Sequence, residues 1–125
     1  MKPKPKGFPK SARIVRRSEY RAVQRSSLRV VTDHFIIYAR KRRRKTNRVG
    51  ITVSKKVGNA VVRNRVKRLV RECFRLLKQE VPKELDLVLV ARNGRGVPSF
   101  KETQRELVSG AHRLLELLMR RQQRT

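Results

Sequence analysis

Residues 85–91, LDLVLVA, constrain the fold of this chain more than any other segment. Side chains alternate between the two faces of a strand, and both alternating sets of this segment are apolar. One face would carry Leu87, Leu89 and Ala91, and the other Val88 and Val90. A strand that is apolar on both faces requires cover on each side. We therefore expect this segment inside a sheet, with other elements packed against both of its faces.

Two other segments alternate in the manner of strands. Residues 34–40, HFIIYAR, and residues 48–54, RVGITVS, each place three apolar side chains on one face. The run of cations between them cannot be buried together and predicts a solvated basic loop. Two strands joined by such a loop predict an antiparallel hairpin. The cations of the loop are Arg40, Lys41, Arg42, Arg43, Arg44 and Lys45.

Two helices are predicted ahead of the 85–91 strand. Residues 18–26, SEYRAVQRS, suit a short helix that Ser18 caps, with Glu19 in its first turn. Residues 60–78 suit a long helix that begins after the N-cap Asn59, because apolar residues recur there every three or four positions. Mostly basic residues occupy the opposite side of this long helix.

A third helix should follow Ser99, because Ser99 and Glu102 form a capping box. Its apolar stripe is Leu107, Ala111, Leu114 and Leu118. The predicted elements run in the order α-β-β-α-β-α, which makes an α+β sandwich of helices packed on a sheet. We assign residues 13–121 to a single domain, residues 1–12 to a flexible basic tail rich in Pro and Lys, and residues 122–125 to a C-terminal tail.

The charge of the chain indicates a polyanionic partner. Lys and Arg number 35 against 9 Asp and Glu, and the resulting formal net charge of +26 repels itself unless it is neutralised. Nucleic acid is favoured, because each neutralised phosphate releases condensed counterions. An anionic membrane surface is the main rival, but the apolar face of the last helix is needed to cover the sheet. No apolar run is long enough to span a bilayer, and the single cysteine, Cys73, fits a reducing compartment, so we expect a cytoplasmic protein with no membrane partner.

The most informative stretch is residues 52–72, TVSKKVGNAVVRNRVKRLVRE. The backbone N–H groups at the start of the helix within it favour an anion. Along this helix Arg63, Lys67 and Arg71 recur every four residues and therefore share one face. A helix of this length spans about 28 Å, which is enough to follow several phosphates. Arginine binds phosphate bidentately and stacks on bases, which favours RNA as the partner.

The run KKVGNAVVRNRVKRLVRE closely resembles the signature of the bacterial ribonuclease P protein, and the triplet Arg63-Asn64-Arg65 matches that family's RNR motif. The segments ARIVRRSEYRAVQR, HFIIYAR and DLVLVAR resemble the family's first helix, its first strand and the strand after the RNR helix, so the resemblance covers about residues 11–120. It implies a two-layer sandwich of the ribosomal S5 domain 2-like type, with a left-handed β-α-β crossover that departs from the usual handedness. It also implies that the RNR helix lies against a catalytic RNA.

The resemblance further implies a cleft between the first helix and the sheet, which holds the single-stranded 5′ leader of precursor tRNA. Unpaired bases stack on aromatic side chains, although the residues alone explain Tyr20 and Tyr38 equally well as core residues. Gln24 stands where the family commonly has an aromatic residue, so stacking there is weaker or is replaced by a hydrogen bond. The residues that match the cleft are Tyr20, Gln24, Tyr38, Thr52, Ser54 and Lys56. Those assigned to the RNA-binding helix and its start are Lys55, Lys56, Asn59, Arg63, Asn64, Arg65, Lys67, Arg68 and Arg71.

The sequence suggests no catalytic or metal-binding residues in the protein itself. Its histidines are His34 and His112 and its aspartates are Asp33 and Asp86, and no arrangement of them suggests a nucleophile with its base or a two-metal site. The resemblance implies that an RNA subunit binds the catalytic Mg²⁺, with one protein per RNA and no cofactor held tightly by the protein. A ribosomal protein or general RNA chaperone is the alternative, and selectivity for precursor over mature tRNA distinguishes the two functions.

Overall fold

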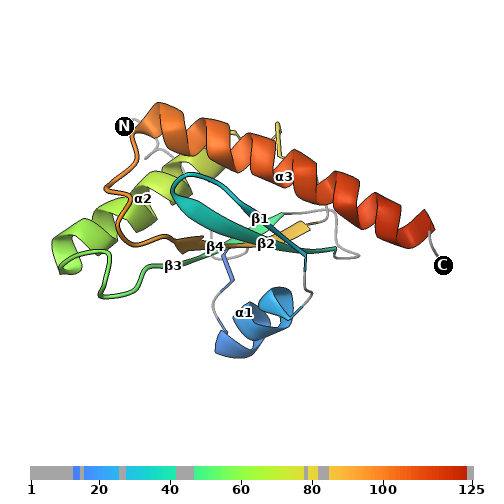
Figure 1. Ribbon diagram of the computed structural model, residues 1–125, viewed down its shortest axis with the longest axis horizontal. Helices are drawn as coiled ribbons and strands as arrows, with labels where there is room; N and C mark the ends of the chain where they lie inside the picture. The colour runs from blue at the N-terminus through green and yellow to red at the C-terminus, as the bar shows by residue number, and fades with distance from the viewer. Residues whose placement is uncertain are drawn as a thin grey trace, which may run out of the picture.

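The computed structural model describes residues 13–14, 16–25, 28–41, 47–77, 79–81 and 85–123. Its elements are α1 (Arg17–Gln24), β1 (Arg29–Val31), β2 (Phe35–Lys41), β3 (Arg48–Thr52), α2 (Ala60–Leu76), β4 (Leu85–Ala91) and α3 (Phe100–Gln123). The strands form one sheet in the order β1-β2-β4-β3, with α2 and α3 on one face and α1 on part of the other (Figure 1). The α+β fold class is confirmed, and α1 adds a third, smaller layer to the expected sandwich.

Strand β4 lies inside the sheet, as its two apolar faces predict. It pairs antiparallel with β2 and parallel with β3. On one face Leu85, Leu87 and Leu89 are buried in the main hydrophobic core, to which α2 and α3 contribute. On the other face Val88 packs with Val23 of α1 in a small second core. Both faces of the strand are therefore covered, by helices from different parts of the chain.

The predicted hairpin between residues 34–40 and 48–54 is wrong, because β4 lies between β2 and β3. Strand β2 instead pairs antiparallel with β1, a strand of 3 residues that the sequence pattern did not predict. The first and last residues of β1 are exposed and it is too short to show a strand periodicity of its own. Strands β2 and β4 both lie in the interior of the sheet, and β4 has apolar side chains covered on both of its faces.

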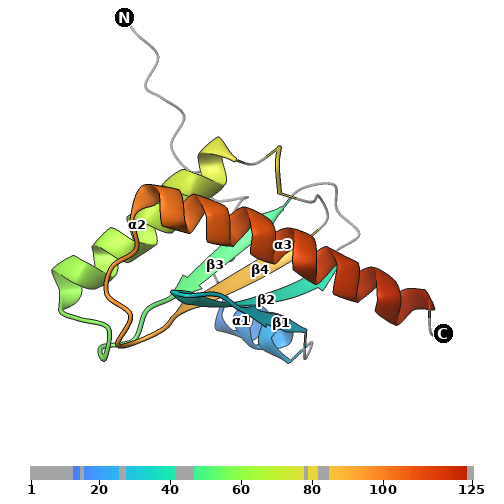
Figure 2. The ribbon, with the colours of Figure 1, turned by 45° about the horizontal axis from the view of Figure 1, so that its top comes forward.

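The connection from β3 through α2 to β4 joins two parallel strands. With α2 and α3 toward the viewer and the strands turned to point upward, β4 lies to the left of β3, so this crossover is left-handed (Figure 2). Helix α2 begins where the sequence predicts, because the Asn59 side chain accepts a hydrogen bond from the Val62 N–H at 3.0 Å. The predicted cap of α1 is wrong: Ser18 lies inside the helix, and the N-cap, Arg16, makes no side-chain capping bond.

Helix α3 has the predicted capping box and the predicted apolar stripe. The Ser99 N–H donates to Glu102 Oε1 at 3.0 Å, and the Glu102 N–H donates to Ser99 Oγ at 3.1 Å. Gly110 lets the helix approach β2 closely, since a Cβ atom there would lie 2.6 Å from Ile37 Cδ1. The buried stripe is Leu107, Ala111 and Leu114, with Leu118 partly buried beside it. In the described part of the chain, no helix is both long enough and apolar enough to cross a bilayer.

A buried carboxylate connects α3 to the turn between β1 and β2. Glu106 Oε1 accepts a hydrogen bond from the His34 N–H at 2.7 Å, and Glu106 Oε2 lies 2.8 Å from His34 Nδ1. Burial acts to raise the pKa of Glu106, but hydrogen bonds from Thr32 and His34 outweigh this effect and hold the pKa below its ordinary value. The folded state therefore favours the ionised form of this carboxyl group.

Glu106 is expected to make the stability of the protein sensitive to acid. A carboxyl group whose pKa is lowered by folding stabilises the folded state above its ordinary pKa of 4.5, and this contribution is lost as the pH falls through the lowered value. Urea unfolding from about pH 6 to about pH 3 should therefore show Glu106→Gln less stable than the native chain at the upper end, with the two curves converging toward acid. Curves that stay parallel over this range contradict the prediction.

Candidate nucleic-acid interface

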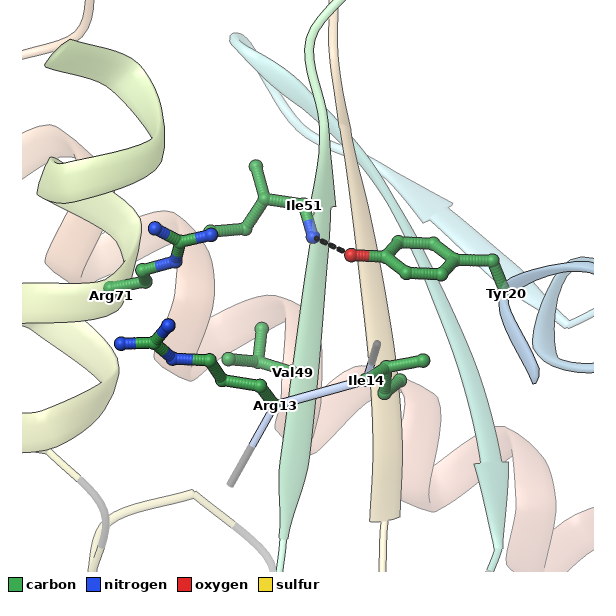
Figure 3. Close-up of a pocket in the computed structure, with 6 residues that line it drawn as sticks. All are labelled: Arg13, Ile14, Tyr20, Val49, Ile51 and Arg71. Carbon is green, nitrogen blue, oxygen red and sulfur yellow. Dashed lines mark hydrogen bonds between the residues drawn. The ribbon is translucent and has the colours of Figure 1, made fainter. Parts of the chain in front are cut away.

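Tyr20 of α1 lies directly over strand β3. Its hydroxyl accepts a hydrogen bond from the Ile51 N–H at 3.2 Å (Figure 3). A Cβ atom at Gly50 would lie 2.6 Å from the Tyr20 ring, so the glycine provides the space that the ring occupies. Ile51 belongs to an edge strand, and Tyr20 supplies an acceptor for an N–H that no neighbouring strand engages. The position of Tyr20 is therefore determined by both packing and hydrogen bonding.

A cleft runs between α1 and the end of β3. It has a volume of about 420 Å³ and is lined by Arg17, Tyr20, Arg21, Gln24 and Thr52. Three residues predicted from the sequence, Tyr20, Gln24 and Thr52, thus lie together in one cleft. Arg17 and Arg21 were missed, although Arg17 lies three residues before Tyr20 and Arg21 three residues before Gln24. This spacing places each pair on neighbouring parts of one helix surface.

The other predicted cleft residues lie elsewhere. Tyr38 is half-buried against the small core around Val88, on the same face of the sheet as Thr52 but not in the lining of the cleft. Ser54 and Lys56 are exposed at the turn that follows β3, because the strand ends at Thr52 rather than at residue 54 as predicted. They belong with Lys55 to the approach to α2.

The cations of α2 fall into two groups that the sequence pattern did not separate. Arg63, Lys67 and Arg71 form the predicted row, but all three are half-buried. Arg71 points toward the edge of β3, where it lies beside Arg13 at a cavity of about 250 Å³ (Figure 3). The exposed side chains of α2 include Asn64, Arg65 and Arg68. The outward basic surface of α2 is therefore displaced around the helix from the predicted row.

A buried carboxylate, Asp86 of β4, lies on the α1 face of the sheet between two arginines. Arg48 Nε and Nη2 donate to Asp86 Oδ1 and Oδ2 at 3.0 and 2.9 Å, and Arg40 Nη2 donates to Oδ2 at 3.1 Å. The hydrogen bonding of Arg48 to the Asp86 carboxylate, which accepts, is the largest cause of the raised pKa of Arg48. Both arginines are in register with Asp86 on the neighbouring strands.

This arrangement corrects the predicted basic loop. Arg40 and Lys41 belong to β2, and Arg40 is held by Asp86 rather than free in a solvated loop. The pattern of six cations concealed this difference because the carboxylate that pairs with Arg40 is 46 residues away in the sequence. The remaining predicted loop residues, Arg42, Arg43, Arg44 and Lys45, lie outside the described residues.

No group of three or more His, Cys, Asp or Glu side chains suited to a metal ion occurs among the residues that the structure describes. Cys73 is buried under α3, and burial raises the pKa of its thiol to about 11. A thiol with such a pKa is a poor nucleophile at neutral pH. What the described residues offer is an exposed basic helix, a half-polar cleft with one tyrosine, and two arginines beside that tyrosine.

Comparisons with known proteins agree on one family. A family model described as ribonuclease P matches residues 8–115. The ribonuclease P protein component of Geotalea uraniireducens is 41% identical over 107 residues, which cover 86% of this chain and 94% of that protein. The corresponding protein of Desulfovibrio desulfuricans is 42% identical over 115 residues, 90% of this chain and 85% of that protein. The solved structure of the ribonuclease P protein from Thermotoga maritima superposes with a TM-score of 0.73 at 28% identity, covering 81% of this chain and 96% of that one.

Proposed function

The chain belongs to the ribonuclease P protein family, and we propose that it binds both the RNA subunit of that enzyme and the 5′ leader of precursor tRNA. Family membership makes it the protein component of a tRNA-processing endoribonuclease, with RNA as a partner. The cleft beside α1 takes the leader, and the outward surface of α2 takes the RNA subunit.

The cleft supports this assignment because it combines an aromatic ring with two cations. Tyr20 is flanked on α1 by Arg17 and Arg21, and Thr52 and Gln24 supply neutral polar groups. A single strand needs cations along its backbone and a flat surface for its unpaired bases, and the contribution of stacking is about 1–3 kcal/mol per base. Gln24 would form hydrogen bonds with the edge of a base, in place of a second aromatic ring on which a base could stack. The cleft therefore suits single-stranded RNA.

The exposed part of α2 supports binding to a structured RNA. Asn64, Arg65 and Arg68 face solvent and are free to contact phosphates and sugars. Helix α2 has 17 residues and begins at the Asn59 cap, so it can follow a groove or a helix end over about 25 Å. Lys55 and Lys56 extend this surface past the start of the helix.

In this proposal the protein contributes no catalytic group. The RNA subunit binds the Mg²⁺ ions that drive hydrolysis, and one protein per RNA neutralises phosphate repulsion and retains the leader. Reducing repulsion between two RNAs favours both substrate and Mg²⁺ binding. The protein is therefore expected to matter most when Mg²⁺ is scarce.

The test is reconstitution with a bacterial ribonuclease P RNA and a precursor tRNA at low Mg²⁺. We expect the protein to increase the rate of leader removal strongly and to bind precursor more tightly than mature tRNA in the assembled enzyme. The purified protein without RNA subunit should cleave nothing. If the protein gives no stimulation and binds both tRNA forms equally, it acts as a general RNA-binding protein of the ribosomal or chaperone type. Cleavage at the mature 5′ end by the protein alone would contradict the division of labour.

A further inference from the structure

Helix α1 forms one wall of the cleft, and its apolar contact with the sheet comes from Val23 and Tyr20, which pack in the small second core. It has 8 residues, it lacks a side-chain cap, and Val23 is its one buried residue. A helix this short is not stable by itself and depends on tertiary contacts. Polar contacts therefore have a large share in determining where α1 lies relative to the sheet.

Those polar contacts come from β3, at two consecutive residues of α1. Glu19 Oε2 lies 2.5 Å from Arg48 Nη2, and the Tyr20 hydroxyl accepts the Ile51 N–H. Arg48 and Gly50 are two residues apart on β3, so both lie on the face that α1 covers. The first turn of α1 is therefore held over this short stretch of strand. The side chains of Arg48 and Glu19 are 14% and 28% exposed, so their ion pair is only partly screened by water.

Arg48 is itself held in a fixed position by Asp86. The carboxylate of Asp86 is fully buried and binds Arg48 through both oxygens, a bidentate geometry that fixes the plane of the guanidinium group. Arg40 contacts the same carboxylate from the other neighbouring strand. The position of Arg48 is thus set by the centre of the sheet and transmitted to α1 through Glu19.

We propose that Asp86, Arg48 and Glu19 form a positioning relay that holds α1 at the distance from the sheet at which the cleft accepts the 5′ leader. The inference rests on the proposed function of the cleft. None of the three residues lines the cleft, so each acts through the placement of Tyr20, Arg17 and Arg21. In this arrangement a carboxylate, Glu19, assists the binding of a polyanion.

The direction in which Glu19→Gln changes the affinity for RNA therefore separates two roles of Glu19. If Glu19 acts only through its charge, its removal makes the protein more positive and strengthens binding of every RNA. If Glu19 positions α1, the variant loses affinity for the leader while its affinity for mature tRNA stays the same or rises slightly. The ratio of the two affinities separates these effects, and general unfolding lowers both affinities together.

The experiment measures dissociation constants of the reconstituted enzyme for precursor and mature tRNA. We expect the preference for precursor over mature tRNA to fall about fivefold in Glu19→Gln. A loss of this size corresponds to the contribution of one partly exposed ion pair. Glu116→Gln is the matched control, since it removes the same charge from an exposed pair with Arg113 on α3. It should leave the preference unchanged. Glu19→Asp keeps the charge but shortens its reach, and we expect an intermediate loss of preference.

A second readout follows the placement of α1 directly. Amide hydrogen exchange at Ile51 should become faster in Glu19→Gln and remain unchanged in Glu116→Gln, because Tyr20 covers that N–H only while α1 is in place. An unchanged or larger precursor preference in Glu19→Gln overturns the relay and leaves the cleft assignment intact. A native enzyme that does not prefer precursor overturns the cleft assignment, and the relay with it.

Discussion

Replacement of Arg65 and Arg68 together by alanine is expected to weaken binding of ribonuclease P RNA by roughly 50-fold at about 0.1 M monovalent salt. Both side chains are exposed on α2, and in the proposed function both contact phosphate. Each lost phosphate contact reduces the slope of log K against log salt concentration by about 0.9. Two lost contacts thus reduce the slope by about 1.8. The electrostatic contribution vanishes at about 1 M salt, so over the decade from about 1 M to about 0.1 M this change of slope gives the expected loss of affinity.

The measurement is the dissociation constant for the RNA subunit over a salt series. Arg120→Ala/Arg121→Ala provides the control, because it removes two exposed cations from the end of α3 and so matches the change in net charge. We expect this control to lose much less affinity and to retain most of the slope. Equal effects of the two double variants would show that RNA binding follows net charge alone and that α2 is not the interface.

Replacement of Asp86 by asparagine is expected to lower the free energy of unfolding by about 3 kcal/mol. The substitution keeps the volume of the side chain but leaves Arg48 and Arg40 without the buried carboxylate that compensates them. Removal of one partner from a buried ion pair is costly because the remaining charge stays in a poorly solvated site. Such a loss is a large fraction of the total stability of a domain of this size.

Urea unfolding measures this effect, with the midpoint expected to fall by about 2 M while the slope stays nearly constant. Asp33→Asn removes the same charge from an exposed turn and should change stability by no more than about 0.5 kcal/mol. If the two variants are equally stable, the ion pairs around Asp86 make no net contribution to folding. The relay proposed above would then have to act on the position of α1 without stabilising the sheet.

Local periodicity was sufficient to predict most of the regular structure and the side of each strand that faces the core. The alternation in residues 85–91 predicted an interior strand covered on both faces, and the structure has this arrangement. Asn59 and the Ser99–Glu102 pair predicted two helix starts, because capping depends on residues three or four positions apart. The family followed from the stretch around Arg63, Asn64 and Arg65, where many residues match at once.

Local pattern did not predict which elements become neighbours. The hairpin prediction failed because periodicity identifies a face of a strand but not its partner, and the sheet places β4 between β2 and β3. For the same reason Arg40 was assigned to a solvated loop, although its carboxylate partner, Asp86, lies on the strand beside it. The small size of β1 left it without a detectable pattern.

The sequence by itself therefore determined the class of fold and the basic helix, since both depend on short-range spacing and on charge. Three members of the cleft followed from the resemblance to the ribonuclease P protein family. The tertiary structure alone decided the strand order, the packing of Tyr20 over Gly50 and the chain of ion pairs from Asp86 through Arg48 to Glu19. These features join residues that are tens of positions apart. Their partners are selected by the arrangement that covers both apolar faces of β4 and pairs the buried carboxylate of Asp86 with two arginines.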